Sequence, residues 1–423
     1  MDFVIENVYG REILDSRGNP TVEVEVRTYS SDSRTRGFGR ASVPSGASTG
    51  SNEAVELRDK NNRYRGKGVK TAVHNVNTIL GPKVVGMDVR RQREIDQIMI
   101  DLDGTDDKSS LGANAILGVS LAVARAAADS YKIPLYQYLG GVNTFTLPVP
   151  TLNILNGGQH AGNELSIQEF MIQPKGAETF REALRWATET YHVLGDVLEQ
   201  KYGNSATNVG YEGGYAPPIN QTNDAMEAIT EAIEEAGYTE DDITIGIDSA
   251  ATSFFDGEKY NVDGETFTGG ELVDYYVELV DTYPIIYIED GFHEEAFDDF
   301  AALSVELPDV INVGDDLFVT NVERFKQGIK MGACNALLLK VNQIGSLSEA
   351  FDAATTAEGN GYDVVVSHRS AETEDSTIAD ISVALGAELI KTGAPARSER
   401  TAKYNQLLRI EEELGDAAHY IRI

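Results

Sequence analysis

The chain has 423 residues, and its 68 acidic residues against 35 basic ones give a formal net charge of −33. Its length suits two domains, or one large barrel with an appended domain. So negative a surface argues against nucleic acid or anionic membranes as partners, because their phosphates would be repelled. The acidic residues are scattered along the chain, as is typical of the solvated faces of folded elements.

The same charge suggests a protein from a high-salt cytoplasm, where screening over a few ångströms removes the self-repulsion. The single cysteine, Cys334, cannot form an internal disulfide, which favours a reducing compartment. Charged residues near the start of the chain leave no apolar core for a signal peptide. The uncharged stretch Ala113–Ala124 is too short to cross a bilayer. We therefore expect a soluble, cytoplasmic protein.

Residues 1–139 predict a smaller α+β domain. Thr21–Thr28 alternates strictly between apolar and polar side chains, which indicates a half-buried antiparallel strand. A turn is expected at Asp15–Pro20, since this segment is rich in turn-forming residues. Further strands are expected at Phe3–Val8 and Phe38–Val43, and helices at Val69–Leu80, Gln92–Asp101 and Ala113–Ala128.

The segment Pro44–Gly50 consists mostly of small residues and is typical of a mobile loop. One interpretation is a plain surface connection. The other is a lid, in which Gly46 and Gly50 act as hinges and let Ser48 close over a ligand. The segment alone leaves both interpretations open.

Residues 140–423 predict a (β/α)8-type barrel, because short apolar segments alternate with helical ones as in parallel strands joined by crossover helices. The helical patterns Phe180–Tyr202 and Asp224–Ala236 both lie between the second and third strands, so the barrel should begin with two adjacent strands. The expected strands are Val149–Leu155, Phe170–Gln173, Thr244–Ile247, Ile285–Ile288, Ile311–Gly314, Ala336–Leu339, Asp363–Val366 and Glu388–Ile390.

Charged or polar residues directly follow six of these strands. In a parallel barrel they would lie together at the rim where barrel enzymes keep their chemistry. Any one of them is as easily structural, since strands are often followed by solvated loops, but six in succession favour a functional site. They are Asp248, Glu289 with Asp290, Asp315 with Asp316, Lys340, His368 with Arg369 and Ser370, and Lys391.

The residue types indicate the chemistry of this rim. Asp248, Glu289 and Asp315 offer only oxygen ligands, which suit a hard cation, Mg²⁺ ahead of Ca²⁺ or Mn²⁺. Lys340 directly follows a buried strand. Either its long side chain carries the amine out to solvent and the lysine is structural, or the amine is poorly hydrated and has a lowered pKa. We expect the metal and Lys391 to lower the pKa of Lys340 further, so that it can act as a base.

Arg369 and Ser370 match the oxygens of a phosphate group. Together with a lysine base and a carboxylate-bound metal, they suggest proton abstraction next to a carboxylate, with the metal stabilising the enolate. His160 and Glu169 flank the first two barrel strands, and Glu212 lies on a glycine-flanked loop. Taken singly, His160 is better interpreted as structural and Glu212 as simply exposed, but beside such a rim Glu212 is the natural acid for a leaving group.

Long motifs along almost the whole chain resemble those of the enolase (phosphopyruvate hydratase) family. They include Asp15-Ser-Arg-Gly-Asn-Pro-Thr-Val-Glu, Val43-Pro-Ser-Gly-Ala-Ser-Thr-Gly, Lys340-Val-Asn-Gln-Ile-Gly-Ser and Ser367-His-Arg-Ser-Ala-Glu-Thr-Glu-Asp. The resemblance implies the reversible dehydration of 2-phosphoglycerate to phosphoenolpyruvate. Lys340 would then remove the C2 proton and Glu212 would protonate the departing C3 hydroxyl. A lysine base with one or two Mg²⁺ ions is a pattern of the enolase superfamily.

The resemblance also implies two Mg²⁺ ions. Asp248, Glu289 and Asp315 would hold the first, while the second would arrive with the substrate and be bound partly by the loop that carries Ser48. Asp315 rather than Asp316 is assigned as the ligand, because it directly follows its strand and keeps the family's spacing to Lys340.

For the rest of the substrate, the resemblance implies that Arg369 and Ser370 bind the phosphate and that Lys391 contacts the carboxylate side. His160 and Glu169 would support the leaving-group side. It further implies a homodimer or higher homo-oligomer. The expected location is the cytoplasm, and also the cell surface, as the resemblance implies. No nucleic-acid or membrane partner is expected.

Some residues depart from the family pattern or bear on alternatives. Tyr211 stands where the family usually has Asp, directly before Glu212, and Gly162 and Glu164 also differ. An acid-sugar or muconate-type relative should carry Lys-x-Lys at the end of the second barrel strand, whereas Gln168-Glu-Phe-Met-Ile-Gln has no lysine. A structural or surface-binding protein without activity should have lost Lys340, Glu212 or a metal carboxylate, and all are present.

Overall fold

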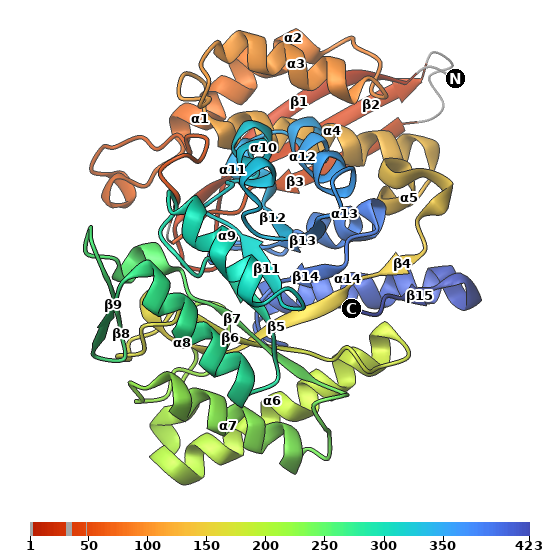
Figure 1. Cartoon of the computed structure of the whole chain (residues 1–423). Helices are drawn as coiled ribbons and strands as arrows, with labels where there is room; N and C mark the ends of the chain where they lie inside the picture. Colours follow the sequence, from red (N-terminus) through yellow and green to blue (C-terminus); the bar gives the residue numbers. More distant parts are fainter. Residues whose placement is uncertain (1–2, 31–35, 48) are drawn as a thin grey trace.

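A computed structural model describes residues 3–30, 36–47 and 49–423, which form a sheet-and-helix layer and a closed barrel (Figure 1). The layer contains an antiparallel sheet in the order β1-β2-β3. Its strands are β1 (Phe3–Leu14), β2 (Pro20–Ser30) and β3 (Arg36–Ser42), with the expected turn between β1 and β2.

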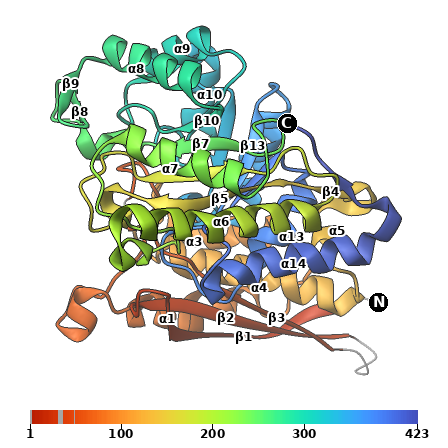
Figure 2. The same cartoon turned by 90° about the horizontal axis from the view of Figure 1, so that it is seen from below.

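The helices of this layer cover one face of the sheet. They are α1 (Lys70–Asn75), a π-helical turn at Val76–Leu80, α2 (Gly81–Val84), α3 (Gln92–Asp103), α4 (Ala113–Tyr131) and α5 (Leu135–Gly140). Helix α4 lies directly on β2 and β3 (Figure 2). It also contacts α11 and α12 of the barrel. The approach is close, since a Cβ atom on Gly39 would lie 2.1 Å from the Ala122 carbonyl oxygen. This explains the small residues of α4.

The barrel closes in the order β10-β11-β12-β13-β14-β5-β6-β7. Its strands are β5 (Val149–Asn156), β6 (Glu169–Gln173), β7 (Thr244–Asp248), β10 (Ile285–Glu289), β11 (Ile311–Gly314), β12 (Ala336–Leu339), β13 (Asp363–Ser367) and β14 (Leu389–Lys391). Each expected barrel strand lies within one residue of the observed one at both ends. The predicted fold class is confirmed.

One strand corrects the expectation of parallel strands, because β6 runs antiparallel to both β5 and β7. Only a loop joins β5 to β6, and a connection without a crossover helix reverses the chain direction. As a consequence, Glu169 pairs with Asn156 at the end of β5 and with Asp248 at the end of β7. The first residue of β6 therefore lies at the same rim as the last residues of its neighbours.

Helices surround the barrel on its outer side (Figure 1). They are α6 (Phe180–Tyr202), α7 (Thr222–Glu235), α8 (Gly269–Thr282), α9 (Phe297–Glu306), α10 (Val322–Met331), α11 (Val341–Ile344), α12 (Leu347–Glu358), α13 (Thr377–Leu385) and α14 (Ser398–Leu414). Two short strand pairs complete the fold: β4 (Thr146–Leu147) with β15 (His419–Tyr420), and β8 (Tyr260–Val262) with β9 (Glu265–Phe267).

Apolar side chains fill the barrel interior. Met171, Tyr287, Val313, Leu338 and Val365 belong to one buried cluster contributed by different strands. A filled interior leaves the rim as the place for polar chemistry. Within the described part of the chain, we find no helix with the length and apolar character of a membrane-spanning segment.

Candidate active site

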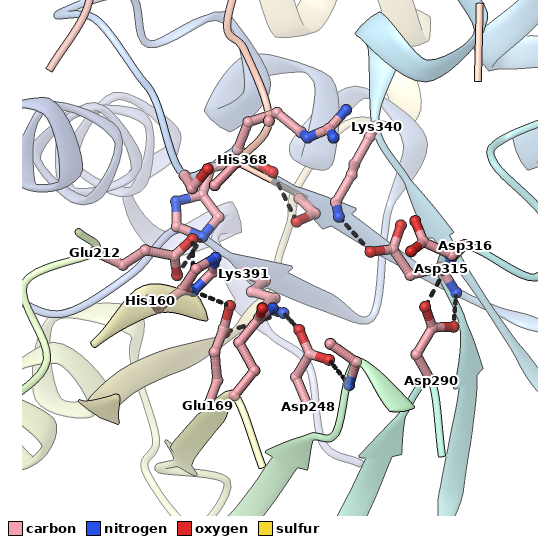
Figure 3. A pocket seen from close by; sticks show the side chains of 17 residues that line it. His160, Glu169, Glu212, Asp248, Asp290, Asp315, Asp316, Lys340, His368 and Lys391 are labelled. Carbon is pink, nitrogen blue, oxygen red and sulfur yellow. Dashed lines mark hydrogen bonds and ion pairs between the residues drawn. The ribbon is translucent and has the colours of Figure 1, made fainter. Parts of the chain in front are cut away.

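The strand ends surround a pocket of about 400 Å³ at this rim (Figure 3). Its lining includes six carboxylates and three cationic side chains: Glu169, Glu212, Asp248, Asp290, Asp315 and Asp316, with Lys340, Arg369 and Lys391. His160 and Ser370 also line it. Of the other residues assigned from the sequence, Glu289 is fully buried next to the pocket, and Ser48 lies outside the described residues. Gly46 and Ala47, from the same loop as Ser48, do line the pocket.

Lys391 lies at the centre of the carboxylates (Figure 3). Its Nζ atom is 2.8 Å from Asp248 Oδ2, 2.9 Å from Glu289 Oε1 and 3.1 Å from Glu169 Oε2. Burial alone would lower the pKa of Lys391, but these carboxylates raise it well above its ordinary value. Lys391 is therefore a fixed ammonium that joins strands β6, β7, β10 and β14.

The protein's own side chains raise the pKa of Lys340, whereas the expected lowering includes the charge of a bound metal ion. Burial lowers this pKa, and Arg369 and Lys391 also act downward, as expected for Lys391. The carboxylates of Asp315 and Glu289 outweigh them, and Asp315 Oδ2 accepts a hydrogen bond from Lys340 Nζ. In this state the amine is protonated and Asp315 stabilises its charge, so Lys340 must lose a proton before it can act as a base.

Asp290 is a site residue to which sequence reasoning gave no role. Its backbone has a φ of 45°, and this left-handed conformation turns the side chain towards the next strand end. Its Oδ1 and Oδ2 atoms each accept a hydrogen bond of 2.8 Å, from the backbone N–H groups of Asp315 and Asp316 respectively. Gln343 Nε2 donates to Asp315 Oδ1 at 2.7 Å. Both contacts fix the position of Asp315.

The residues present fit a hard cation. Among the described residues, the carboxylate oxygens of Asp290, Asp315 and Asp316 come close enough to share one ion. The expected set is arranged differently, since Lys391 holds Asp248 and Glu289 while Lys340 holds Asp315. The rim holds more carboxylates than cations, and burial together with the neighbouring Asp315 raises the pKa of Asp316 to about 8. Oxygen ligands with excess negative charge suit a divalent metal ion.

Glu212 faces two imidazoles on the opposite side of the pocket (Figure 3). Its Oε2 atom accepts a hydrogen bond of 3.0 Å from Asn153 Nδ2 and lies 3.2 Å from His368 Nε2. Its Oε1 atom lies 3.7 Å from His160 Nδ1, which is 3.2 Å from Glu169 Oε1. His160 therefore stands between two buried carboxylates.

The protonation states on this side follow from burial and charge. Burial lowers the pKa of His368 to about 3, with Arg400 acting in the same direction, so its imidazole is neutral at neutral pH. Burial and the charge of Glu212 raise the pKa of Glu169. Burial alone would also raise the pKa of Glu212. The two histidines lower it by more than burial raises it, so the pKa of Glu212 lies well below its ordinary value. In this state Glu169 holds a proton more readily than Glu212.

The phosphate-binding pair assigned from the sequence lies at the pocket's edge. Arg369 donates to Glu53 through Nη1 and Nη2, both at 2.9 Å, and through Nη1 to Asn342 Oδ1 at 3.2 Å. Glu53 comes from the N-terminal layer and was not assigned from the sequence. The Ser370 hydroxyl is buried and has no hydrogen-bond partner within the described residues, so it can serve a ligand oxygen.

Tyr211, the departure before Glu212, points away from the acid. Its side chain is 45% exposed, and its ring centroid lies 5.8 Å from the guanidinium carbon of Arg17. Only its backbone approaches the site, where the Tyr211 carbonyl accepts a hydrogen bond of 3.2 Å from Arg400. The substitution therefore places no side chain against Glu212.

Comparisons with known proteins show the family of the chain. Residues 5–139 match the family model "Enolase, N-terminal domain", and residues 144–422 match "Enolase, C-terminal TIM barrel domain". The chain is 68% identical over 423 residues to "Enolase" of Methanosarcina barkeri, covering 100% of this chain and 97% of the relative. It is 69% identical over 422 residues to "Enolase" of Methanococcoides burtonii, covering 100% and 98%, and 60% identical over 422 residues to "Enolase" of Pyrococcus furiosus, covering 99% and 97%. The chain belongs to the enolase family.

Proposed function

We propose that Lys340 and Glu212 are the base and the acid of the reversible dehydration of 2-phospho-D-glycerate to phosphoenolpyruvate. The chain is an enzyme, a carbon–oxygen lyase with the reaction of the enolase family in glycolysis and gluconeogenesis. One observation carries the assignment of roles: Lys340 and Glu212 face each other from opposite sides of one pocket (Figure 3). Such a pair can remove a proton from one carbon and deliver one to the leaving group on the next.

The steps follow from these positions. Lys340 separates from Asp315 and gives its ammonium proton to solvent, and the neutral Nζ then takes the proton on C2 of the substrate. The electron pair released at C2 forms the C2–C3 double bond, the C3–O bond breaks, and the hydroxyl takes a proton from Glu212 and leaves as water. His160 lies between Glu169 and Glu212, so it can pass the proton that Glu169 holds to Glu212.

We assign the first of two Mg²⁺ ions to Asp248, Glu289 and Asp315, and a share of the second, which arrives with the substrate, to Ser48. When bound, the metal would neutralise the substrate carboxylate and stabilise the enolate. The excess of carboxylates over cations at the rim supports this assignment.

The remaining contacts complete the proposal. Arg369 and Ser370 bind the phosphate of the substrate. Lys391 contacts the side of the pocket that binds the substrate carboxylate, and His160 and Glu169 lie on the side of the leaving hydroxyl. The buried, unpartnered Ser370 hydroxyl supports the phosphate position.

We also propose a domain division into residues 1–139 and 140–423, a homodimer or higher homo-oligomer, and a cytoplasmic location with some enzyme at the cell surface. The charge of −33 supports a high-salt cytoplasm and the lack of nucleic-acid and membrane partners.

The experiment is an ultraviolet assay of phosphoenolpyruvate formation from 2-phosphoglycerate, with Mg²⁺ or EDTA, at a series of KCl concentrations. We expect product with Mg²⁺, none with EDTA, and activity that rises with KCl. An absence of product with Mg²⁺ at every salt concentration would overturn the proposal.

A further inference from the structure

Arg400, in the first turn of α14, is a fully buried cation that joins two loops of the active site. Its Nη1 atom donates to His368 Nδ1 and to the Arg369 carbonyl oxygen, both at 2.6 Å. Its Nη2 atom donates to the Ser370 carbonyl at 2.6 Å and to the Tyr211 carbonyl at 3.2 Å. One side chain thus connects the loop after β13 to the loop that carries Glu212.

The contact with His368 determines where the imidazole proton lies. A guanidinium only donates hydrogen bonds and stays charged in proteins, so His368 Nδ1 must be the acceptor. The proton of the neutral ring is then on Nε2, which is 3.2 Å from Glu212 Oε2. The other tautomer would set two N–H groups against each other in a buried site, at the cost of an unpaired donor.

We propose that Arg400 is a positioning residue that locks His368 in the Nε2–H tautomer and so gives Glu212 a fixed hydrogen-bond donor. The inference deepens the proposed function, since it rests on Glu212 as the acid. Asn153 Nδ2 donates to Oε2, and His368 Nε2 approaches the same oxygen to 3.2 Å and needs only a small reorientation to donate to it, so the opposite oxygen, Oε1, is the one that gains and loses the proton. That oxygen faces His160, which approaches Glu169.

A lysine at position 400 could not make the same hydrogen bonds. Arg400 serves four acceptors from two nitrogen atoms held in one plane, whereas a lysine ammonium donates from a single nitrogen. Lys403, on the same helix, provides the natural contrast. It is equally buried, but its Nζ atom donates to Glu372 Oε2 and to the carbonyls of Thr373 and Glu399. It holds the same loop without contacting His368.

The direct test is ¹⁵N NMR of the full-length protein labelled on histidine, with His368 assigned by its loss in H368N. The chain has 6 histidines, so the spectrum is simple. We expect a neutral His368 with its proton on Nε2, and we expect R400K and R400Q to lose this single tautomer while K403M keeps it. A proton on Nδ1 in the unsubstituted protein, or an unchanged His368 signal in R400K, would overturn the proposal.

A kinetic test distinguishes a positioning role of Arg400 from a general loss of stability. R400K should slow dehydration about 10- to 100-fold, the range for residues that orient a catalytic group, while exchange of the C2 proton, which depends on Lys340, falls much less. R400K and H368N together should be no worse than the more severe single variant, since both act on one contact. K403M should lower the melting temperature without changing the ratio of exchange to dehydration.

The outcomes distinguish this inference from the function on which it rests. Independent, multiplying effects of R400K and H368N, or an equal loss of exchange and dehydration in R400K, would overturn the role of Arg400. If the unsubstituted enzyme forms no phosphoenolpyruvate, the proposed function fails, and the tautomer measurement still decides what Arg400 does to His368.

Discussion

The outer face of the N-terminal sheet and the barrel rim both gather acidic and basic side chains, but the balance differs. On the sheet, Arg11 Nη1 lies 2.5 Å from Glu23 Oε1 and 2.9 Å from Glu25 Oε1, and Arg40 Nη2 lies 2.7 Å from Glu25 Oε1. Two arginines thus match two carboxylates. The hydrogen bond from Arg11 is the main cause that lowers the pKa of Glu25 to about 2.

At the rim, six carboxylates face three cations, and several pKa values move the other way. Burial and Asp248 raise the pKa of Glu289 well above its ordinary value, and burial with Asp315 does the same for Asp290. Like charges held together without enough counter-charge cost folding free energy. The charges on the sheet balance one another, whereas the rim has more carboxylates than cations and so suits an added cation.

The largest effects should separate the two halves of the proposed reaction at the rim. K340A should abolish exchange of the C2 proton, and E212Q should stop dehydration while exchange continues. Each loss should be about 10²- to 10⁴-fold, the usual contribution of a general acid or base. Exchange followed by NMR, with dehydration followed by ultraviolet absorbance, measures both steps.

The matched control is E25Q on the sheet, which should change neither rate. Exchange that persists in K340A would refute the base, and dehydration at the normal rate in E212Q would refute the acid. A slow E25Q enzyme would show that the sheet is coupled to the chemistry and would break the comparison.

The second effect concerns metal-dependent stability. Mg²⁺ at about 100 times its dissociation constant should stabilise the unsubstituted protein by about 2.7 kcal/mol, and E289Q should lose most of this gain. Because the folded pKa of Glu289 is raised, the folded state binds its proton more tightly, so its contribution to stability falls as pH rises above the ordinary value. E289Q should therefore be less sensitive to pH in EDTA.

Melting curves of both proteins with Mg²⁺ or EDTA provide the measurement. An equal Mg²⁺-induced rise in Tm for E289Q and the unsubstituted protein would remove Glu289 from the metal site. E25Q again serves as the control, and it should keep the full rise.

Much of the barrel could be predicted because it obeys local rules. Buried strands leave runs of apolar residues, and the residue after each run falls at the rim, which is how Asp248, Asp315, Lys340 and Lys391 were found. The direction of β6 was missed, since an apolar run looks the same in a parallel and in an antiparallel strand. Its position beside β5, read from the absence of a helix between them, was correct.

The remaining site depends on distant pairings that one sequence does not display. Glu53 meets Arg369 from another layer of the fold, and Arg400 meets His368 from the final long helix. Asp290 was visible as a second acid after β10, but only a backbone φ of 45° turns it onto the amides of Asp315 and Asp316. The contact between Lys340 and Asp315 could not be predicted either, because the sequence presents Asp315 only as a metal ligand.

A third, smaller effect concerns the excess charge of the whole surface. We expect molar KCl to raise the Tm by about 2 °C relative to low salt, which corresponds to about 2 kcal/mol for a chain of 423 residues. The reason is that screening weakens the repulsion that a net charge of −33 creates. Calorimetry at constant pH in EDTA measures it, and a Tm that does not rise with KCl would contradict a high-salt adaptation.

The smallest effect lies on the sheet and has the opposite pH dependence to Glu289. The folded pKa of Glu25 is lowered to about 2 from an ordinary 4.5, so its stabilising contribution is present above about pH 4.5 and is lost as the pH falls towards 2. Its ion pairs are partly screened by solvent, so E25Q should cost about 1 kcal/mol or less at neutral pH. Urea unfolding of E25Q and the unsubstituted protein should therefore differ at pH 7 and converge as the pH falls towards 2. A difference that grows on acidification would show that Glu25 is held by packing and not by its arginines, and the sheet would no longer stand as the balanced counterpart of the rim.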